Sequence, residues 1–297
     1  MRKILAIICA ALVAISLFGC STPQEEVQVV LMALDSDYWR SMKAGAEAAG
    51  ADLGLVVEVS APAKETDVLD QVNLIEIAAS KSPKALIVAP CDPDMVVSSL
   101  SAAKEAGINT VLFDSDVAEG NRDCRTVFVG ISNYDAAYDA GSQIVPYLYD
   151  GATVLVINKN PAATDHADRE QGFVDALKEA YPNLNVVVKV PDEDARTSSY
   201  TIVEDFLSVN QVDLIYGTAA DIVSGAIEAI DDKDVQVVGF DVEPATEGYL
   251  DAGKQLMCID QDPYNIGYEA VKAAVTGNVG EQGILYLPAT LHRGSKQ

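Results

Sequence analysis

Short apolar runs recur along the whole chain and are separated by longer segments with a different spacing of apolar residues. The runs are Gln28–Leu34, Val56–Val59, Ala85–Val88, Thr110–Phe113, Val127–Val129, Val154–Ile157, Val186–Val190, Leu214–Tyr216, Val235–Phe240, Leu256–Ile259 and Ile284–Leu287. Most are continuously apolar rather than alternating, which is typical of strands that helices cover on both faces. The pattern therefore predicts buried strands of parallel sheets.

The intervening segments have the periodicity of amphipathic helices. In the first of them, Met42, Ala46, Ala49 and Leu53 lie three or four residues apart. The predicted helices are Tyr38–Leu53, Val68–Ala79, Met95–Ala106, Asp135–Leu148, Glu170–Ala180, Tyr200–Leu207, Ile222–Ile230 and Ile266–Thr276. Repeated strand–helix units predict an α/β fold with right-handed crossovers. The number of strands is large for one open sheet, so we expect two doubly wound parallel-sheet lobes.

The amino-terminal segment has the features of a secretory signal. Arg2 and Lys3 precede the apolar run Ile4–Leu17, which only Ser16 interrupts. About fourteen apolar residues are too few for a membrane span, which needs roughly 20, but they suit a signal core. We therefore expect residues 1–19 to be a signal peptide. A plain signal peptide without lipidation and an uncleaved anchor are the alternatives.

The end of this segment resembles the bacterial lipoprotein signal, in which a cysteine is lipidated and becomes the new amino terminus. The chain reads Leu-Phe-Gly-Cys at residues 17–20, and Phe18 departs from the small residue usual at its position. The resemblance implies lipidation at Cys20, a linker over residues 20–26, and an extracytoplasmic protein anchored to the bacterial cell membrane by acyl chains. Stable anchoring takes more than one acyl chain.

Composition excludes several classes of function. A net charge of −25 repels nucleic acid, so no nucleic-acid partner is expected. The chain has only two histidines, which disfavours a histidine-rich metal site, and no phosphate-binding glycine loop or nucleophile elbow follows a strand, so no cofactor is predicted. Outside the signal and Cys20, three cysteines remain. Cys91, Cys124 and Cys258 are expected to be buried free thiols, with a Cys91–Cys124 disulfide as the alternative.

Polar and aromatic side chains follow several of the predicted strands. These are residues 35–39 after the first strand, Asp114 after the fourth, Asp165 and Arg169 after the sixth, Asp241 after the ninth, and Asp260-Gln261 after the tenth. Ligands of parallel α/β sheets bind beyond the carboxyl ends of the strands. Carboxylates accept and a guanidinium donates hydrogen bonds to hydroxyl groups, and aromatic faces suit the C–H face of a sugar ring. The set predicts a polyol-binding site.

Some of these residues also have purely structural interpretations. Asp37 and Asp221 are placed to cap helices, because carboxylates at helix starts accept free N–H groups. Arg169 can pair with a neighbouring carboxylate on the surface, and Trp39 can belong to the core. His166 is expected to be solvated.

The motifs around these residues resemble type I periplasmic binding proteins of the ribose/galactose-binding family over residues 27–287. The matching segments are Val237-Val238-Gly239-Phe240-Asp241, Val111-Leu112-Phe113-Asp114, Arg169-Glu170-Gln171-Gly172-Phe173, and Gln261 followed by Ile266-Gly267. The resemblance implies ligand contacts from Ser36, Tyr38, Trp39, Asp114, Asp165, Arg169, Asp241 and Gln261. Asp165 and Arg169 are four residues apart and so share a helix face.

Two positions depart from the family pattern. Thr218-Ala219-Ala220-Asp221 stands where members have Asn-Asp, so the Asn contact is replaced by an alanine. Asp194 stands near the position of an aromatic residue that closes the second face of the sugar. The resemblance predicts the binding role and leaves the ligand open.

The family architecture implies a hinge of three crossing segments, near residues 131, 261 and 284. The amino-terminal lobe is expected to comprise residues 27–131 and 262–284, and the carboxyl-terminal lobe residues 132–261 and 285–297. A small sugar or polyol bound in the interlobe cleft would be delivered to an ABC permease with a cytoplasmic ATPase. The alternatives are a ligand sensor for a membrane receptor or kinase and, on paired carboxylates alone, a secreted carbohydrate-active enzyme. We expect a binding protein rather than an enzyme, because no Ser–His or Cys–His pairing is evident.

Overall fold

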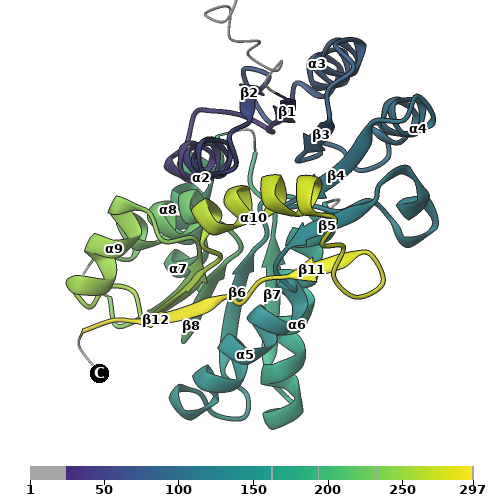
Figure 1. The fold of residues 1–297 in the computed structure, drawn as a ribbon. Coiled ribbons are helices and arrows are strands. Elements are labelled where there is room, and N and C mark those ends of the chain that lie inside the picture. The colour runs from purple at the N-terminus through teal and green to yellow at the C-terminus, as the bar shows by residue number, and fades with distance from the viewer. Residues whose placement is uncertain (1–24, 162, 193, 232, 296–297) are drawn as a thin grey trace, which may run out of the picture.

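The computed structural model describes residues 25–161, 163–192, 194–231 and 233–295, which form two α/β lobes (Figure 1). The strands of the amino-terminal lobe are β1 (Glu26–Val30), β2 (Val56–Ser60), β3 (Ala85–Val88), β4 (Asn109–Phe113), β5 (Val127–Gly130) and β11 (Ile284–Tyr286). They form a parallel six-stranded sheet in the order β2-β1-β3-β4-β5-β11. The predicted α/β fold with two lobes is confirmed.

The carboxyl-terminal lobe repeats this plan with one reversed strand. Its strands are β6 (Thr153–Ile157), β7 (Asn185–Lys189), β8 (Leu214–Gly217), β9 (Gln236–Phe240), β10 (Met257–Asp260) and β12 (Thr290–Arg293). The order is β7-β6-β8-β9-β10-β12, and only β12 runs antiparallel to its neighbour. Each predicted apolar run became one strand of these two sheets, whereas β12 was not predicted.

Helices cover both faces of each sheet. The amino-terminal lobe has α2 (Asp37–Leu53) and α10 (Pro263–Thr276) on one face and α3 (Val68–Ser80) and α4 (Val97–Glu105) on the other. The carboxyl-terminal lobe has α5 (Asn133–Ile144) and α6 (Thr164–Ala180) on one face and α7 (Ala195–Val209) and α8 (Ala220–Ile230) on the other. Short helices η1 (Glu119–Cys124), η2 (Val145–Tyr147) and α9 (Pro244–Asp251) complete the set, and α9 was not predicted. Burial on both faces explains why the strands are continuously apolar.

In each lobe, glycines let two neighbouring helices cross at close range. A Cβ atom on Gly267 of α10 would lie 2.1 Å from the carbonyl oxygen of Met42 in α2. In the other lobe, a Cβ atom on Gly172 of α6 would lie 2.2 Å from the carbonyl oxygen of Tyr134 in α5. Both distances are far below van der Waals contact, so these crossings require glycine.

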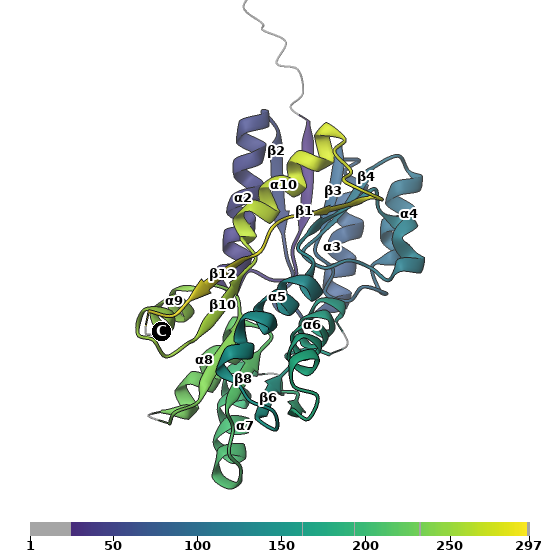
Figure 2. The same cartoon turned by 90° about the horizontal axis from the view of Figure 1, so that it is seen from below.

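The chain passes between the lobes three times: after β5, between β10 and α10, and between β11 and β12, which run on from one lobe to the other in Figure 2. β11 pairs with β5 as far as Tyr286, and β12 joins β10 from Thr290. The expected lobe boundary between residues 284 and 285 is therefore wrong by a few residues, because the whole of β11 belongs to the amino-terminal sheet.

The remaining structural expectations concern cysteines and the surface. Cys91, Cys124 and Cys258 are free thiols; Cys124 and Cys258 are buried, and Cys91 is half-buried. The expectation of unpaired thiols is confirmed, although burial is complete for only two.

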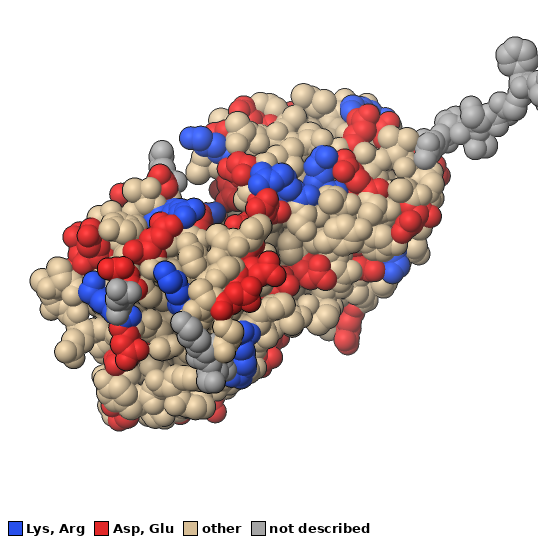
Figure 3. Space-filling model, turned by 90° about the vertical axis from the view of Figure 1, so that its left-hand side faces the viewer, with Lys and Arg blue, Asp and Glu red and all other residues tan. Residues whose placement is uncertain are grey.

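Acidic side chains predominate on the face drawn in Figure 3, in line with the net charge. Within the described ranges no helix is long and apolar enough to cross a membrane, and the predicted signal and Cys20 lie outside those ranges.

Candidate ligand-binding cleft

A cavity of about 530 Å³ lies between the lobes at the carboxyl ends of the strands. The amino-terminal lobe contributes residues that follow β1, β2 and β4, and the carboxyl-terminal lobe contributes residues that follow β6, β7, β8, β9 and β10. Its lining includes all eight predicted site residues, namely Ser36, Tyr38, Trp39, Asp114, Asp165, Arg169, Asp241 and Gln261. The fold thus brings the predicted residues together, and their contacts with a ligand stay a prediction.

Asp114 and Asp241 occupy equivalent places in the two lobes. Asp114 directly follows β4 and Asp241 directly follows β9, and both adopt left-handed backbone conformations, with φ of 67° and 70°. The backbone N–H of Asp114 donates to the carbonyl of Val129 on β5 at 3.0 Å, and that of Asp241 donates to Ile259 on β10 at 2.8 Å. Asp is among the residues that tolerate this conformation. β4 and β9 are each the fourth strand in the order of their sheet. Each sheet therefore places one carboxylate in the cleft at the end of its fourth strand.

Arg169 of α6 is held from several sides. Its Nε donates to Oδ1 of Asn133 at 2.8 Å, its Nη1 donates to the carbonyl of Thr218 at 2.9 Å, and its guanidinium lies 4.3 Å from the centroid of the Phe240 ring. Nη2 lies 3.9 Å from Oδ2 of Asp165. The side chain is 4% exposed. Arg169 is therefore a buried, oriented cation in the cavity wall, and the alternative of a surface ion pair is wrong.

The amino-terminal lobe supplies the aromatic wall. Tyr38 and Trp39, in the first turn of α2, contact each other edge to face with ring centroids 5.1 Å apart. The Tyr38 hydroxyl donates to Asp114, and Trp39 Nε1 donates to Oε1 of Glu65 at 2.8 Å. Ser36 is the N-cap of α2, since its Oγ accepts from the backbone N–H of Trp39. Its hydroxyl is therefore already engaged in the helix start.

The prediction that Asp37 and Asp221 cap helices is wrong in detail. Asp37 lies one residue inside α2, where it pairs with Arg40 at 2.6 Å. Asp221 lies in the first turn of α8, where its Oδ2 contacts Nζ of Lys159 at 3.2 Å. Both carboxylates remain near positive helix ends, which favours them electrostatically.

Electrostatics distinguish the three central carboxylates. Burial, with the nearby charge of Asp165, raises the pKa of Asp114 to about 7. Burial also raises the pKa of Asp241, although Arg169 and the hydrogen bond from Gln261 at 2.6 Å oppose this. Burial acts in the same direction on Asp165, but His166, Arg169 and backbone N–H groups outweigh it and lower its pKa. The cluster therefore has more carboxylates than its one guanidinium neutralises.

His166 was expected to be solvated, and this is wrong. Its side chain is 12% exposed, and Nδ1 lies 2.9 Å from Oγ1 of Thr218. Burial lowers its pKa to about 4. At neutral pH the ring is uncharged and lines the cavity as a hydrogen-bonding group.

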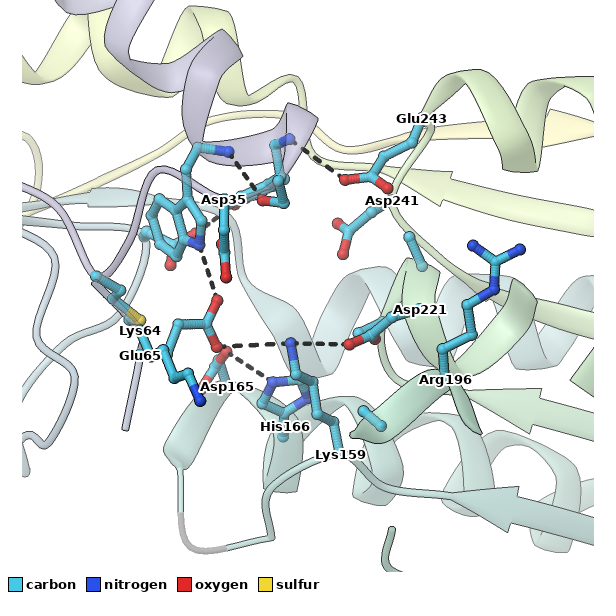
Figure 4. Close-up of a pocket in the computed structure, with 18 of the residues that line it drawn as sticks. Asp35, Lys64, Glu65, Lys159, Asp165, His166, Arg196, Asp221, Asp241 and Glu243 are labelled. Atoms are coloured by element: carbon cyan, nitrogen blue, oxygen red, sulfur yellow. Dashed lines mark hydrogen bonds and ion pairs between the residues drawn. The ribbon is translucent and has the colours of Figure 1, made fainter. Parts of the chain in front are cut away.

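Glu65, Lys159 and Glu243 are cavity residues that the sequence did not single out (Figure 4). Nζ of Lys159 lies 3.5 Å from Oε2 of Glu65 and thus links the two lobes. A second link joins Oε1 of Glu243 to the backbone N–H of Tyr38 at 3.3 Å. Lys159 follows β6, so the strand-end rule was sufficient to find it. Glu65 lies in the β2–α3 loop, and no sequence signal placed it opposite Lys159.

The two departures from the family pattern also face the cavity. Ala219 and Ala220 line its wall at the start of α8, and Asp194 lines it at the start of α7. The Asp194 carboxylate is the N-cap of α7, since it accepts from the backbone N–H of Thr197 at 3.2 Å. Among the described residues, no group of three or more His, Cys, Asp or Glu side chains is arranged to hold a metal ion.

Two parallel-sheet lobes with a polar cavity at their facing strand ends define a two-lobed α/β ligand-binding protein. The chain belongs to the periplasmic binding protein family: the model of the periplasmic binding protein domain matches residues 27–281.

Curated relatives match the chain over nearly its whole length. The ribose import binding protein RbsB of Salmonella typhimurium is 25% identical over 305 residues, which cover 100% of this chain and 99% of that protein. The D-allose-binding periplasmic protein of Escherichia coli is 26% identical over 288 residues, or 93% of this chain and 91% of that protein.

Solved structures show the same fold. A periplasmic solute-binding protein of Actinobacillus succinogenes with bound D-allose superposes with a TM-score of 0.82 at 22% identity, covering 90% of this chain and 97% of that one. A carbohydrate transporter solute-binding protein of Agrobacterium radiobacter, in complex with D-arabinose, has a TM-score of 0.81 at 26% identity and covers 93% of this chain and 96% of that one.

Proposed function

We propose that this chain is the extracytoplasmic solute-binding component of an ABC importer, and that it captures a sugar or related polyol between its lobes. The observation that carries the proposal is the cavity in which Asp114 of one lobe faces Arg169 and Asp241 of the other. The names of the relatives support it, because both curated relatives bind or import sugars. The name of the ribose relative specifies import, which favours uptake over a receptor-coupled sensing role.

The site has the chemistry that sugar hydroxyls require. The carboxylates of Asp165 and Asp241 accept hydrogen bonds from sugar hydroxyl groups, and the free N–H groups of Arg169 donate to the hydroxyl oxygens. Tyr38 and Trp39 offer aromatic surface from the opposite lobe. Because these groups come from both lobes, a ligand that touches all of them stabilises the closed arrangement.

A ligand that contacts both lobes binds the closed state more tightly than the open state, and this difference in affinity drives closure. A ligand that favours the closed state by about 5.5 kcal/mol shifts a population of 1:99 to 99:1. The three crossings between the lobes would act as the hinge, as in other hinge-closing proteins. The closed protein would then dock on a membrane permease that a cytoplasmic ATPase drives.

Calorimetric titration tests the binding role. D-Ribose, D-allose, D-apiose, D-arabinose, D-fucose and D-galactose are titrated into the wild-type protein, Asp241→Ala and Asp234→Ala. Asp241→Ala should weaken binding by about 1.5–3 kcal/mol, because the ligand loses a charge-assisted acceptor. Asp234 is exposed and does not line the cavity, so Asp234→Ala should bind as wild type. Unchanged affinity in Asp241→Ala would refute the site.

We also propose that Cys20 carries the lipid anchor, and the Leu-Phe-Gly-Cys signal supports this. Bacteria expressing the chain are grown with a clickable palmitate analogue. Wild type should incorporate the label and stay with the membrane fraction, whereas Cys20→Ser should lose the label. Labelled Cys20→Ser protein would contradict the proposal.

The proposed role is binding without catalysis. Relatives that are solute-binding proteins support it. Incubation of the protein with aryl glycosides should release no phenol, and enzyme-dependent release that Asp241→Ala abolishes would overturn the non-catalytic assignment.

A further inference from the structure

The cavity has two parts that differ in burial. The inner half is formed by the buried side chains of Asp114, Arg169 and Gln261, together with the partly buried Tyr38, Asp165 and Asp241. The outer half is formed by the more exposed side chains Lys64, Glu65, Lys159, Asp194, Arg196 and Asp221. Figure 4 shows Lys159 between Glu65 and Asp221, away from Asp241.

The cavity is larger than one sugar ring. Its volume of about 530 Å³ lies within the range of about 300–1,000 Å³ typical of pockets for drug-sized ligands, which are larger than one hexose. A monosaccharide bound to the inner half therefore leaves the outer half to solvent.

The carboxyl-terminal lobe lines part of the cavity with small side chains. Three alanines, Ala195, Ala219 and Ala220, lie there at the starts of α7 and α8. Among the described lining residues, the aromatic ones are Tyr38 and Trp39, and both belong to the other lobe. Small side chains on this wall leave room beside the inner ring instead of enclosing it.

The outer half is polar and carries charges of both signs. Its six residues comprise three acidic and three basic side chains, and Asp35 and Glu243 add two further carboxylates to the cavity lining. Lys159 contacts both Glu65 and Asp221, and Arg196 pairs with Glu228, so part of this charge is compensated within the protein. Hydroxyl groups find both hydrogen-bond donors and acceptors on such a surface.

We infer that the ligand is a sugar with a second hydroxylated unit, such as a disaccharide, whose first ring occupies the inner half and whose second unit occupies the outer half. This inference rests on the proposed sugar-binding function and specifies its ligand class. The second unit contacts Lys159 and Asp221 and lies against the alanine wall.

Paired titrations test the inference. Glucose, galactose, mannose, xylose and arabinose are compared by calorimetry with cellobiose, maltose, lactose, melibiose, mannobiose, xylobiose and arabinobiose. At least one disaccharide should bind about tenfold tighter than its constituent monosaccharides, which corresponds to about 1.4 kcal/mol. A monosaccharide that binds while no disaccharide binds more tightly would overturn the inference and leave the proposed function intact. Absence of binding by the whole set would instead count against both.

Substitutions locate the second unit. Ala220→Phe should remove the disaccharide advantage, since it fills the wall against which the second unit lies. Ala44→Phe, on an exposed position of α2 outside the cavity, is the matched control and should bind both as wild type. Unchanged disaccharide affinity in a folded Ala220→Phe protein would overturn the inference.

A second variant covers the case in which Ala220→Phe does not fold. Asp221→Ala removes an outer hydrogen-bonding group on a partly exposed side chain. It should weaken the disaccharide about fivefold and leave the monosaccharide unchanged, in line with the loss of a single hydrogen bond. Equal weakening of both ligands would contradict the division into two halves.

Discussion

The two lobes share one plan and differ in what they present to the cleft. Their strand orders correspond, and Asp114 after β4 matches Asp241 after β9 in both position and left-handed backbone. The helices that follow the second strand of each sheet, α2 after β1 and α6 after β6, present different side chains to the cleft. In one lobe α2 presents Tyr38 and Trp39, whereas in the other α6 presents Asp165 and Arg169.

This difference divides the work of recognition between the lobes. The amino-terminal lobe offers aromatic surface and one carboxylate whose pKa is raised to about 7. The carboxyl-terminal lobe offers an oriented guanidinium with two carboxylates beside it. Neither lobe alone carries the full set, so a ligand that uses all of it must lie between them.

The largest effect is expected from removing the cation of the carboxyl-terminal lobe. Arg169→Met keeps much of the side-chain volume but leaves Asp165 and Asp241 without their buried partner. Breaking a buried ion pair on one side costs about 3–5 kcal/mol. Chemical denaturation should show a loss of that size, with sugar binding abolished. A protein as stable as wild type would mean that Arg169 does not compensate these carboxylates.

The next effect concerns the glycine crossings, which the two lobes share. Gly267→Ala forces a Cβ atom against Met42, and Gly172→Ala forces one against Tyr134. Overpacking of this kind costs about 1–3 kcal/mol. Thermal unfolding should show a lower midpoint for both variants. Gly248→Ala, at a position in α9 where a Cβ meets no atom within 4 Å, is the control and should be as stable as wild type or more stable, because alanine is favoured over glycine in helices. If only one crossing is sensitive, the lobes differ in packing as well as in chemistry.

A smaller effect is the pH dependence of binding that Asp114 causes. Hydroxyl groups donate to the ionised carboxylate, and the pKa of Asp114 in the free protein is about 7. Affinity should therefore rise between pH 6 and pH 8, by about tenfold per unit at most below the pKa. Calorimetry of Asp114→Asn should give weaker and nearly flat binding over this range. The same slope in wild type and variant would assign the titration to another group.

The same carboxylate also affects the stability of the free protein. Its folded pKa of about 7 lies above the unfolded value of about 3.9, so the folded state binds more protons between these pH values. This contribution to the free energy of unfolding is complete below about pH 4 and is lost as pH rises through 7. Denaturation of wild type and Asp114→Asn at pH 5 and 8 should show a steeper fall for wild type. Parallel behaviour would contradict the raised pKa.

The fold was largely predictable because the strands are buried on both faces. Continuous apolar runs such as residues 85–88 and 154–157 mark such strands directly. β12 was not predicted because three of the four residues of Thr290-Leu291-His292-Arg293 are polar and the strand lies at a sheet edge. α9 escaped because it is short, and its periodic apolar residues are few.

The candidate site was predictable where strand ends carry it. Asp114 and Asp241 follow their strands directly, so sheet geometry alone brings them to the cleft. The pairing of Glu65 with Lys159 depends on how the lobes face each other, and the burial of His166 depends on Thr218 from a distant strand end. Such contacts are set by tertiary packing, which local sequence patterns do not encode.

The central claim is that one ligand bridges both lobes. The most direct test is titration of the tightest-binding sugar into Asp114→Ala and Asp241→Ala, which remove equivalent carboxylates from opposite lobes. Both variants should bind at least about tenfold more weakly than wild type, because each loses a hydrogen-bond acceptor. Wild-type affinity in either variant would show that the ligand contacts one lobe only and would contradict the account.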